Sequence, residues 1–113
     1  MSQEWLRPAD EEWQARVPIP ASHPAFTGHF PEDPVFPGVA LLDLVLCALR
    51  ERRSDRLYIT TIRSVRWRAL VRPGQVLDLN ARGPSTDGRL SFEIRNADAL
   101  VCHGVLVVTE GAG

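Results

Sequence analysis

Hydrophobic and polar residues alternate with a period of two along the second half of the chain, a pattern that predicts β-strands. The clearest case is residues 89–95, where three apolar side chains alternate with polar ones. Similar alternation predicts strands at residues 65–71, 77–82 and about 100–108, with short turns between them. Short turns between consecutive strands favour a four-stranded antiparallel meander with one solvated face.

A long apolar run at residues 39–49 predicts a helix from Gly38 to about Arg52. Asp43 is the only charged residue within that run. Because a helix that is apolar on every side is normally buried on every side, we expect the rest of the chain to wrap around it. Together these elements predict an α+β fold in which a curved antiparallel sheet surrounds one helix.

Six of the nine prolines lie between Pro18 and Pro37, ahead of the helix. Proline removes a backbone donor and fixes φ, so this region cannot form a helix or a central strand. We expect one short strand near residues 15–20 and otherwise an ordered loop. Long irregular segments in small domains are usually functional or disordered, and the three phenylalanines and two histidines of this one disfavour disorder.

Length and charge narrow the possible functions. A chain of 113 residues fits one domain, residues 1–113, whose thin core favours association with a second copy. A net charge of −1 argues against nucleic-acid binding. The chain starts without the basic and apolar segments of a signal peptide, and its apolar run is too short to span a bilayer, so we expect a soluble, cytoplasmic protein.

Two residue types need separate comment. Cys47 and Cys102 lie in apolar stretches, so we expect small buried side chains and neither a disulfide framework nor a metal site. All 13 basic residues are arginine. Codon bias explains the missing lysines simply, and the alternative is that arginines were selected to bind acidic or phosphorylated groups.

Three residues in and after the proline-rich loop suggest chemistry. His29 lies in a stiffened loop and could act as a general base near neutral pH. A carboxyl such as Asp43 in an apolar helix must be paired, hydrogen-bonded or protonated through a raised pKa. Gly38 lies at the helix N-terminus, where free N–H groups favour a developing negative oxygen. Taken singly, each also has an ordinary structural explanation: loop packing, a buried hydrogen bond and a turn.

Together these residues form a longer motif, His29-Phe30-Pro31-x-x-Pro34-Val35-x-Pro37-Gly38-Val39, followed by Asp43. It resembles the signature of the hotdog-fold 3-hydroxyacyl-acyl-carrier-protein dehydratases, the FabZ and FabA families. Val65-x-Trp67, followed by Val71-Arg72-Pro73-Gly74, is similar to the stretch after the helix in the same families. Chain length and Leu41-Leu42-Asp43 most resemble the small ApeI-type dehydratases of aryl-polyene gene clusters.

The resemblance implies a role for each motif residue. His29 removes a proton from C2 of the thioester, and Asp43, supplied by the partner subunit, protonates the leaving C3 hydroxyl. The Gly38 amide binds the thioester carbonyl. The acyl chain is expected to contact Phe26, Phe36, Val39 and helix residues such as Leu42 and Leu46.

The resemblance also implies the partners of the protein. No metal or cofactor is needed, because the phosphopantetheine arm of an acyl carrier protein holds the substrate. The chain is expected to form a homodimer, or a heterodimer with another hotdog subunit. Candidate residues for docking the acidic carrier protein are Arg63, Arg66, Arg68 and Arg72.

Two departures from the family pattern keep other functions open. Glu32 replaces the usual glycine after His-Phe-Pro, and Asp43 stands where many FabZ-type members have glutamate. The alternatives to a dehydratase are a hotdog acyl thioesterase and a non-catalytic hotdog partner subunit. The sequence leaves acyl chain length, aromatic preference and isomerase activity undetermined.

Overall fold

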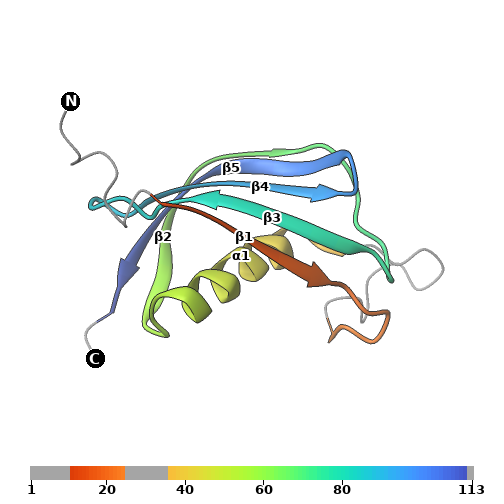
Figure 1. Ribbon diagram of the computed structural model, residues 1–113, viewed down its shortest axis with the longest axis horizontal. Coiled ribbons are helices and arrows are strands. Elements are labelled where there is room, and N and C mark those ends of the chain that lie inside the picture. The colour runs from red at the N-terminus through yellow and green to blue at the C-terminus, as the bar shows by residue number, and fades with distance from the viewer. Residues whose placement is uncertain (1–10, 25–35, 112–113) are drawn as a thin grey trace.

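The computed structural model describes residues 11–24 and 36–111. These residues form one helix and five strands (Figure 1), namely β1 (Glu12–Pro18), α1 (Gly38–Arg52), β2 (Leu57–Trp67), β3 (Val76–Arg82), β4 (Arg89–Asn96) and β5 (Ala99–Glu110). The helix has the predicted bounds. Among the described residues, no helix is both long enough and apolar enough to cross a membrane.

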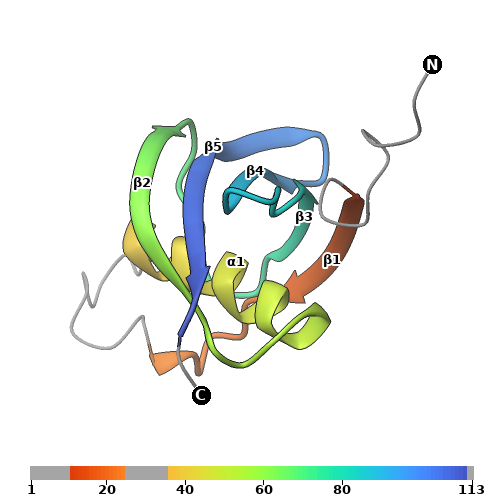
Figure 2. The same ribbon diagram turned by 90° about the vertical axis from the view of Figure 1, so that its left-hand side faces the viewer.

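The strands form one antiparallel sheet in the order β1-β3-β4-β5-β2. Figure 2 shows the sheet curving around α1, with β1 and β2 at its two edges. The predicted α+β arrangement of a curved sheet around one helix is therefore confirmed. The predicted four-stranded meander is wrong, because only β3, β4 and β5 are neighbours in chain order and β2 pairs with β5.

The segment after β2 explains this difference. Its predicted turn at residues 72–75 is not a hairpin between neighbouring strands. Instead the Ile19 N–H donates to the Gln75 carbonyl at 2.8 Å, and the Gly74 N–H donates to the Ile19 carbonyl at 2.7 Å. Val71 forms an isolated bridge with Phe36. Backbone groups of this segment thus form hydrogen bonds with residues that precede α1 in the chain. The chain then continues from β2, at one edge of the sheet, into β3, which lies beside β1 at the other edge.

One face of α1 supplies the centre of the core. Its buried side chains are Leu41, Leu42, Val45 and Leu49. They pack with inward-facing residues of the sheet such as Leu77, Leu79, Leu90, Phe92 and Leu106. Burial of these side chains provides the main favourable free energy of folding.

The opposite face of α1 is exposed, which corrects the prediction of a helix buried on all sides. Val39 is 76% exposed, and Asp43 and Cys47 are also exposed. The expectation of a buried Cys47 is therefore wrong, whereas Cys102 is buried as predicted. The physical reason is that this chain has one sheet layer, which covers only one side of the helix.

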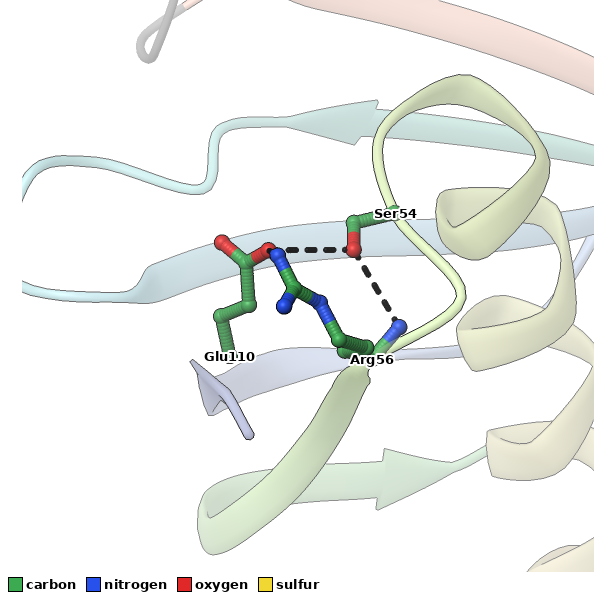
Figure 3. Close-up of polar contacts among 3 residues, drawn as sticks. All are labelled: Ser54, Arg56 and Glu110. Atoms are coloured by element: carbon green, nitrogen blue, oxygen red, sulfur yellow. Dashed lines mark hydrogen bonds and ion pairs between the residues drawn. The ribbon is translucent and has the colours of Figure 1, made fainter. Parts of the chain in front are cut away.

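Two sets of contacts connect the edge strands to the rest of the fold. On β1, the buried Trp13 indole donates to the Gly83 carbonyl at 3.0 Å, and the Arg52 guanidinium lies 5.3 Å from the Trp13 ring centroid. At the start of β2, Arg56 and Ser54 both donate to the Glu110 carboxylate on β5, at 2.7 and 3.1 Å (Figure 3). These contacts fix both edges relative to α1 and β5.

Candidate active site

The N-terminus of α1 is anchored by the residue two positions ahead of it. Phe36 is 3% exposed, and its N–H donates to the Val71 carbonyl at 2.7 Å. The His23 ring packs edge-on against Phe36, with ring centroids 4.8 Å apart. Phe36, a predicted substrate-binding residue, therefore lies in the core and sets the position at which the helix begins.

Helix geometry leaves free donors at this end of α1. The amides of Ala40 and Leu41 donate to the Pro37 carbonyl at 3.0 and 3.3 Å, which begins the helical pattern. The N–H groups of Gly38 and Val39 come before this pattern and have no acceptor within the helix. Because the positive end of the helix dipole lies at the same place, the two amides can bind a carbonyl oxygen that gains negative charge.

Trp67, at the end of β2, packs against Gly38. A Cβ atom at position 38 would lie 3.1–3.3 Å from three atoms of the Trp67 ring, closer than ordinary contact. The indole itself remains 50% exposed. A side chain at position 38 would therefore require the Trp67 ring to shift. No role at the site was predicted for Trp67, although the resemblance to the dehydratase families includes Val65-x-Trp67.

Asp43 lies on the exposed face of α1, between Val39 and Cys47. Residues four apart share a helix face, so the Cα atoms of Val39 and Asp43 are separated by about 6 Å along the helix axis. The Cys47 Sγ lies 3.9 Å from Asp43 Oδ2. The expectation that this carboxyl is buried is wrong for the single chain, because the sheet covers the other face of the helix.

The Cys47 thiol is affected by the same neighbourhood. Partial loss of hydration raises the pKa of Cys47, and the negative charge of Asp43 raises it further, while Arg50 acts in the opposite direction. The thiol therefore stays protonated near neutral pH and can act as a donor to the carboxylate. As for Trp67, no role at the site was predicted for Cys47 from the sequence.

Other predicted site residues lie outside the described residues. His29 and Phe26 both belong to residues 25–35, as does Glu32. Of the predicted site residues, the structure brings together Gly38, Val39 and Asp43 on one helix. The predicted catalytic histidine, His29, lies outside the described residues.

The predicted docking arginines fall in one region of the chain. Arg63 and Arg66 lie on β2, Arg68 follows it directly, and Arg72 precedes β3; all four are exposed. Within the described ranges, Arg63, Arg66 and Arg68 form no ion pair. By contrast, Arg50 donates to the Leu57 carbonyl at 2.7 Å, and Arg56 pairs with Glu110. Arg50 and Arg56 thus have structural roles, whereas three cations on and beside β2 remain available.

A groove of about 450 Å³ lies on the outer face of the sheet, where β1 and β3 meet. Its polar lining includes Arg16 and Asp78, which form an ion pair with a 3.0 Å separation. None of the predicted site residues lines this groove. Among the described residues, the candidate site consists of an exposed face of α1 and the helix end at Gly38.

Comparison with known proteins agrees with this arrangement. The family described as "ApeI-like: ApeI dehydratase" matches residues 5–105. The 3-hydroxyacyl-[acyl-carrier-protein] dehydratase FabZ of Methylobacterium sp. (strain 4-46) is 35% identical over 109 residues, covering 81% of this chain and 66% of the relative. The FabZ of Chlamydia caviae is 33% identical over 106 residues, covering 86% of this chain and 66% of the relative. The chain thus spans about two thirds of each of these relatives.

A solved structure shows the same architecture. The dehydratase heterocomplex ApeI:P from Xenorhabdus doucetiae contains a chain that superposes with a TM-score of 0.79 at 23% sequence identity, with 92% of each chain covered. At this identity the likeness concerns the fold, and it agrees with the curved sheet around α1. The chain therefore belongs to the ApeI-like dehydratase family and has the hotdog fold.

Proposed function

We propose that this protein removes water from 3-hydroxyacyl thioesters of an acyl carrier protein to give trans-2-enoyl thioesters. One observation carries the proposal: the Asp43 carboxyl is exposed on the same helix whose first amides, at Gly38 and Val39, have no acceptor within the helix. An acid and a carbonyl-binding donor set are thus held about one helical turn apart on a rigid element. Family membership supports the same reaction.

The proposed chemistry is an elimination. His29 takes the C2 proton of the substrate, and the electron pair left on C2 forms the C2–C3 double bond. The C3–O bond breaks, and the hydroxyl leaves as water after receiving a proton from Asp43. Meanwhile the N–H of Gly38 donates to the thioester carbonyl oxygen, which gains negative charge as C2 loses its proton. Dehydration in this form needs no metal or redox cofactor.

We further propose that the complete site contains two hotdog subunits. β2 is an edge strand of the described sheet, and several apolar side chains on and near it are exposed, namely Val39, Ile62, Trp67 and Leu70. An uncovered apolar patch beside an open strand edge is a favourable surface for strand pairing. A second subunit on this edge would cover the exposed face of α1 and bring its own His29 toward Asp43.

The acyl carrier protein is the proposed partner for the arginines on and beside β2. Arg63, Arg66 and Arg68 are exposed and unpaired within the described ranges. The carrier protein is acidic and its arm carries a phosphate, which guanidinium groups bind through paired hydrogen bonds. With a net charge of −1, the chain must attract this partner through a local patch of positive charge.

The deciding assay is incubation of the purified protein with 3-hydroxydecanoyl carrier protein, followed by intact mass measurement. Loss of one water from the carrier supports the proposed dehydration. Release of a free thiol on the carrier arm would instead indicate a thioesterase. An unchanged carrier would favour a non-catalytic partner subunit.

Two substitutions test the assigned roles. His29→Ala removes the base, and Asp43→Asn removes the acid while keeping the side-chain shape, so we expect each to reduce water loss at least about 100-fold. Because Asp43 is exposed in the single chain, the melting temperature of Asp43→Asn should stay close to that of the wild type. Retention of activity in either variant would contradict the corresponding role. Thermal unfolding of the same samples controls for misfolding.

A further inference from the structure

Cys47 lies one helical turn after Asp43, on the same exposed face of α1. Its sulfur lies 3.9 Å from Asp43 Oδ2, within the range of a weak S–H···O hydrogen bond. Within the described ranges, the thiol is the only hydrogen-bond partner of this carboxyl. The acid of the proposed reaction therefore has one contact that restricts its orientation, and a cysteine provides it.

The direction of this hydrogen bond follows from the protonation of the thiol. Partial burial disfavours the thiolate and raises the pKa of Cys47, and a negative charge on Asp43 raises it further. A protonated thiol beside a carboxyl donates to it, so the S–H occupies Oδ2. The other oxygen, Oδ1, is then left to carry the proton that goes to the leaving hydroxyl.

We propose that Cys47 is a positioning residue, which holds the Asp43 carboxyl in the orientation required for proton delivery. This inference rests on the proposed dehydratase function. Without a hydrogen-bond partner, the carboxyl would sample several rotamers, and only some of these would direct Oδ1 toward the substrate. The thiol limits this sampling without adding charge, because it stays neutral near pH 7.

A competing role for Cys47 is that it simply contacts the acyl chain of the substrate. The two roles affect different kinetic constants. Loss of a wall contact weakens substrate binding and raises KM, whereas loss of acid orientation lowers kcat and leaves KM nearly unchanged. The kinetic constants of Cys47 variants therefore distinguish the roles.

The kinetic experiment compares Cys47→Ala and Cys47→Ser with the wild type, using 3-hydroxydecanoyl carrier protein. We expect Cys47→Ala to lower kcat roughly three- to ten-fold with KM within about two-fold, in line with the loss of one modest hydrogen bond. Cys47→Ser keeps a donor and should restore kcat to within about two-fold of the wild type. Glu51→Ala, one turn further along α1, is the matched control and should keep the wild-type kcat.

A spectroscopic measurement detects the contact without relying on activity. The infrared S–H stretch of Cys47 is the band that disappears in Cys47→Ala. We expect this band to move to higher frequency in Asp43→Ala, because that substitution removes the acceptor of the S–H hydrogen bond. An unmoved band would show that the thiol does not donate to Asp43.

The outcomes separate this inference from the proposed function. An inactive wild type would reject the dehydratase function and the positioning role with it. An active wild type would reject the positioning role alone if Cys47→Ala keeps its kcat, if only KM changes, or if Cys47→Ser is as impaired as Cys47→Ala. A selective loss of kcat that serine restores, together with the band shift, supports the role.

Discussion

Gly38 combines two requirements at a single position. Its amide is one of the donors at the start of α1 that have no acceptor within the helix. The missing side chain lets the Trp67 ring lie against the helix backbone. The aromatic ring in turn covers one side of the helix end while remaining half exposed. We therefore expect residue 38 to control the shape of the substrate site more than the stability of the fold.

Gly38→Ala tests this expectation. The added methyl would lie 3.1 Å from the Trp67 ring, so the indole must shift by a few tenths of an ångström. Because the ring is half exposed and alanine favours helix, the free energy of unfolding should change by less than about 1 kcal/mol. The tryptophan emission should change and kcat/KM should fall. A second substitution, Trp67→Leu, should partly relieve the clash, and an unchanged kcat/KM in Gly38→Ala would contradict this account.

At the scale of elements, the edge strand β2 is held by close contact with β5. Val65 is paired with Gly104, and a Cβ at position 104 would lie 2.2 Å from the Ser64 carbonyl oxygen. Backbone atoms cannot yield as a flexible side chain can. The absence of a side chain at position 104 thus allows β2 to follow β5 and to place Trp67 beside α1.

Gly104→Ala should therefore separate the two strands near their paired ends. We expect a loss of stability of about 1–3 kcal/mol or more, because the clash is with backbone. Hydrogen exchange should increase selectively at the amides of β2 and β5, and urea unfolding would measure the loss. Gly111→Ala is a suitable control, since its nearest contact is 3.5 Å away. Equal exchange in both variants would argue against the close contact.

The elements differ in how well their sequences predicted them. α1, β3, β4 and β5 have strong apolar patterns, and the structure places them at or near the predicted residues. β2 was predicted too late, at residues 65–71, because most of its side chains are exposed and show no clear alternation. The pairing of β2 with β5 was also not predicted, because the two strands are far apart in the sequence and the local pattern of residues does not determine which strands pair.

The candidate site was predicted unevenly for a similar reason. Gly38 and Asp43 lie on one helix, so local spacing placed them correctly. The exposure of Asp43 was not predicted, because an apolar helix suggests burial on every side, whereas the single sheet covers only one side of α1. No site role was predicted for Cys47 or Trp67, because their importance depends on contacts with Asp43 and Gly38 that only the folded chain reveals.

At the scale of the whole molecule, three of the described arginines without an ion pair, Arg63, Arg66 and Arg68, lie on or directly after the edge strand β2. Arg66 lies on β2, opposite His103 on β5, and Arg68 directly follows the strand. Elsewhere on the sheet, several arginines are neutralised locally, as in the pairs Arg16–Asp78 and Arg95–Glu93. The edge that we propose for carrier docking therefore differs from the outer face of the sheet, where ion pairs cancel most of the charge.

Arg66→Glu tests this charge distribution. Reversing the charge should raise KM for the carrier-bound substrate about ten-fold and leave KM for a small thioester analogue nearly unchanged. Arg89→Glu, at the start of β4, makes the same change in net charge and should affect neither constant. A similar increase for both substrates would indicate that Arg66 acts within the site rather than in carrier docking. Added salt should weaken the carrier-specific effect.

The exposed face of α1 has one further consequence. If Asp43 acts together with the histidine of another subunit, two variants that are inactive alone can restore activity by complementation when they form a mixed dimer. A mixed dimer of His29→Ala and Asp43→Asn contains one site with both wild-type residues and one site with neither. Random association of equal amounts makes half of the dimers mixed, so the mixture should recover about one quarter of wild-type activity. A site confined to one chain would recover none, and dilution below the dissociation constant should abolish the recovery.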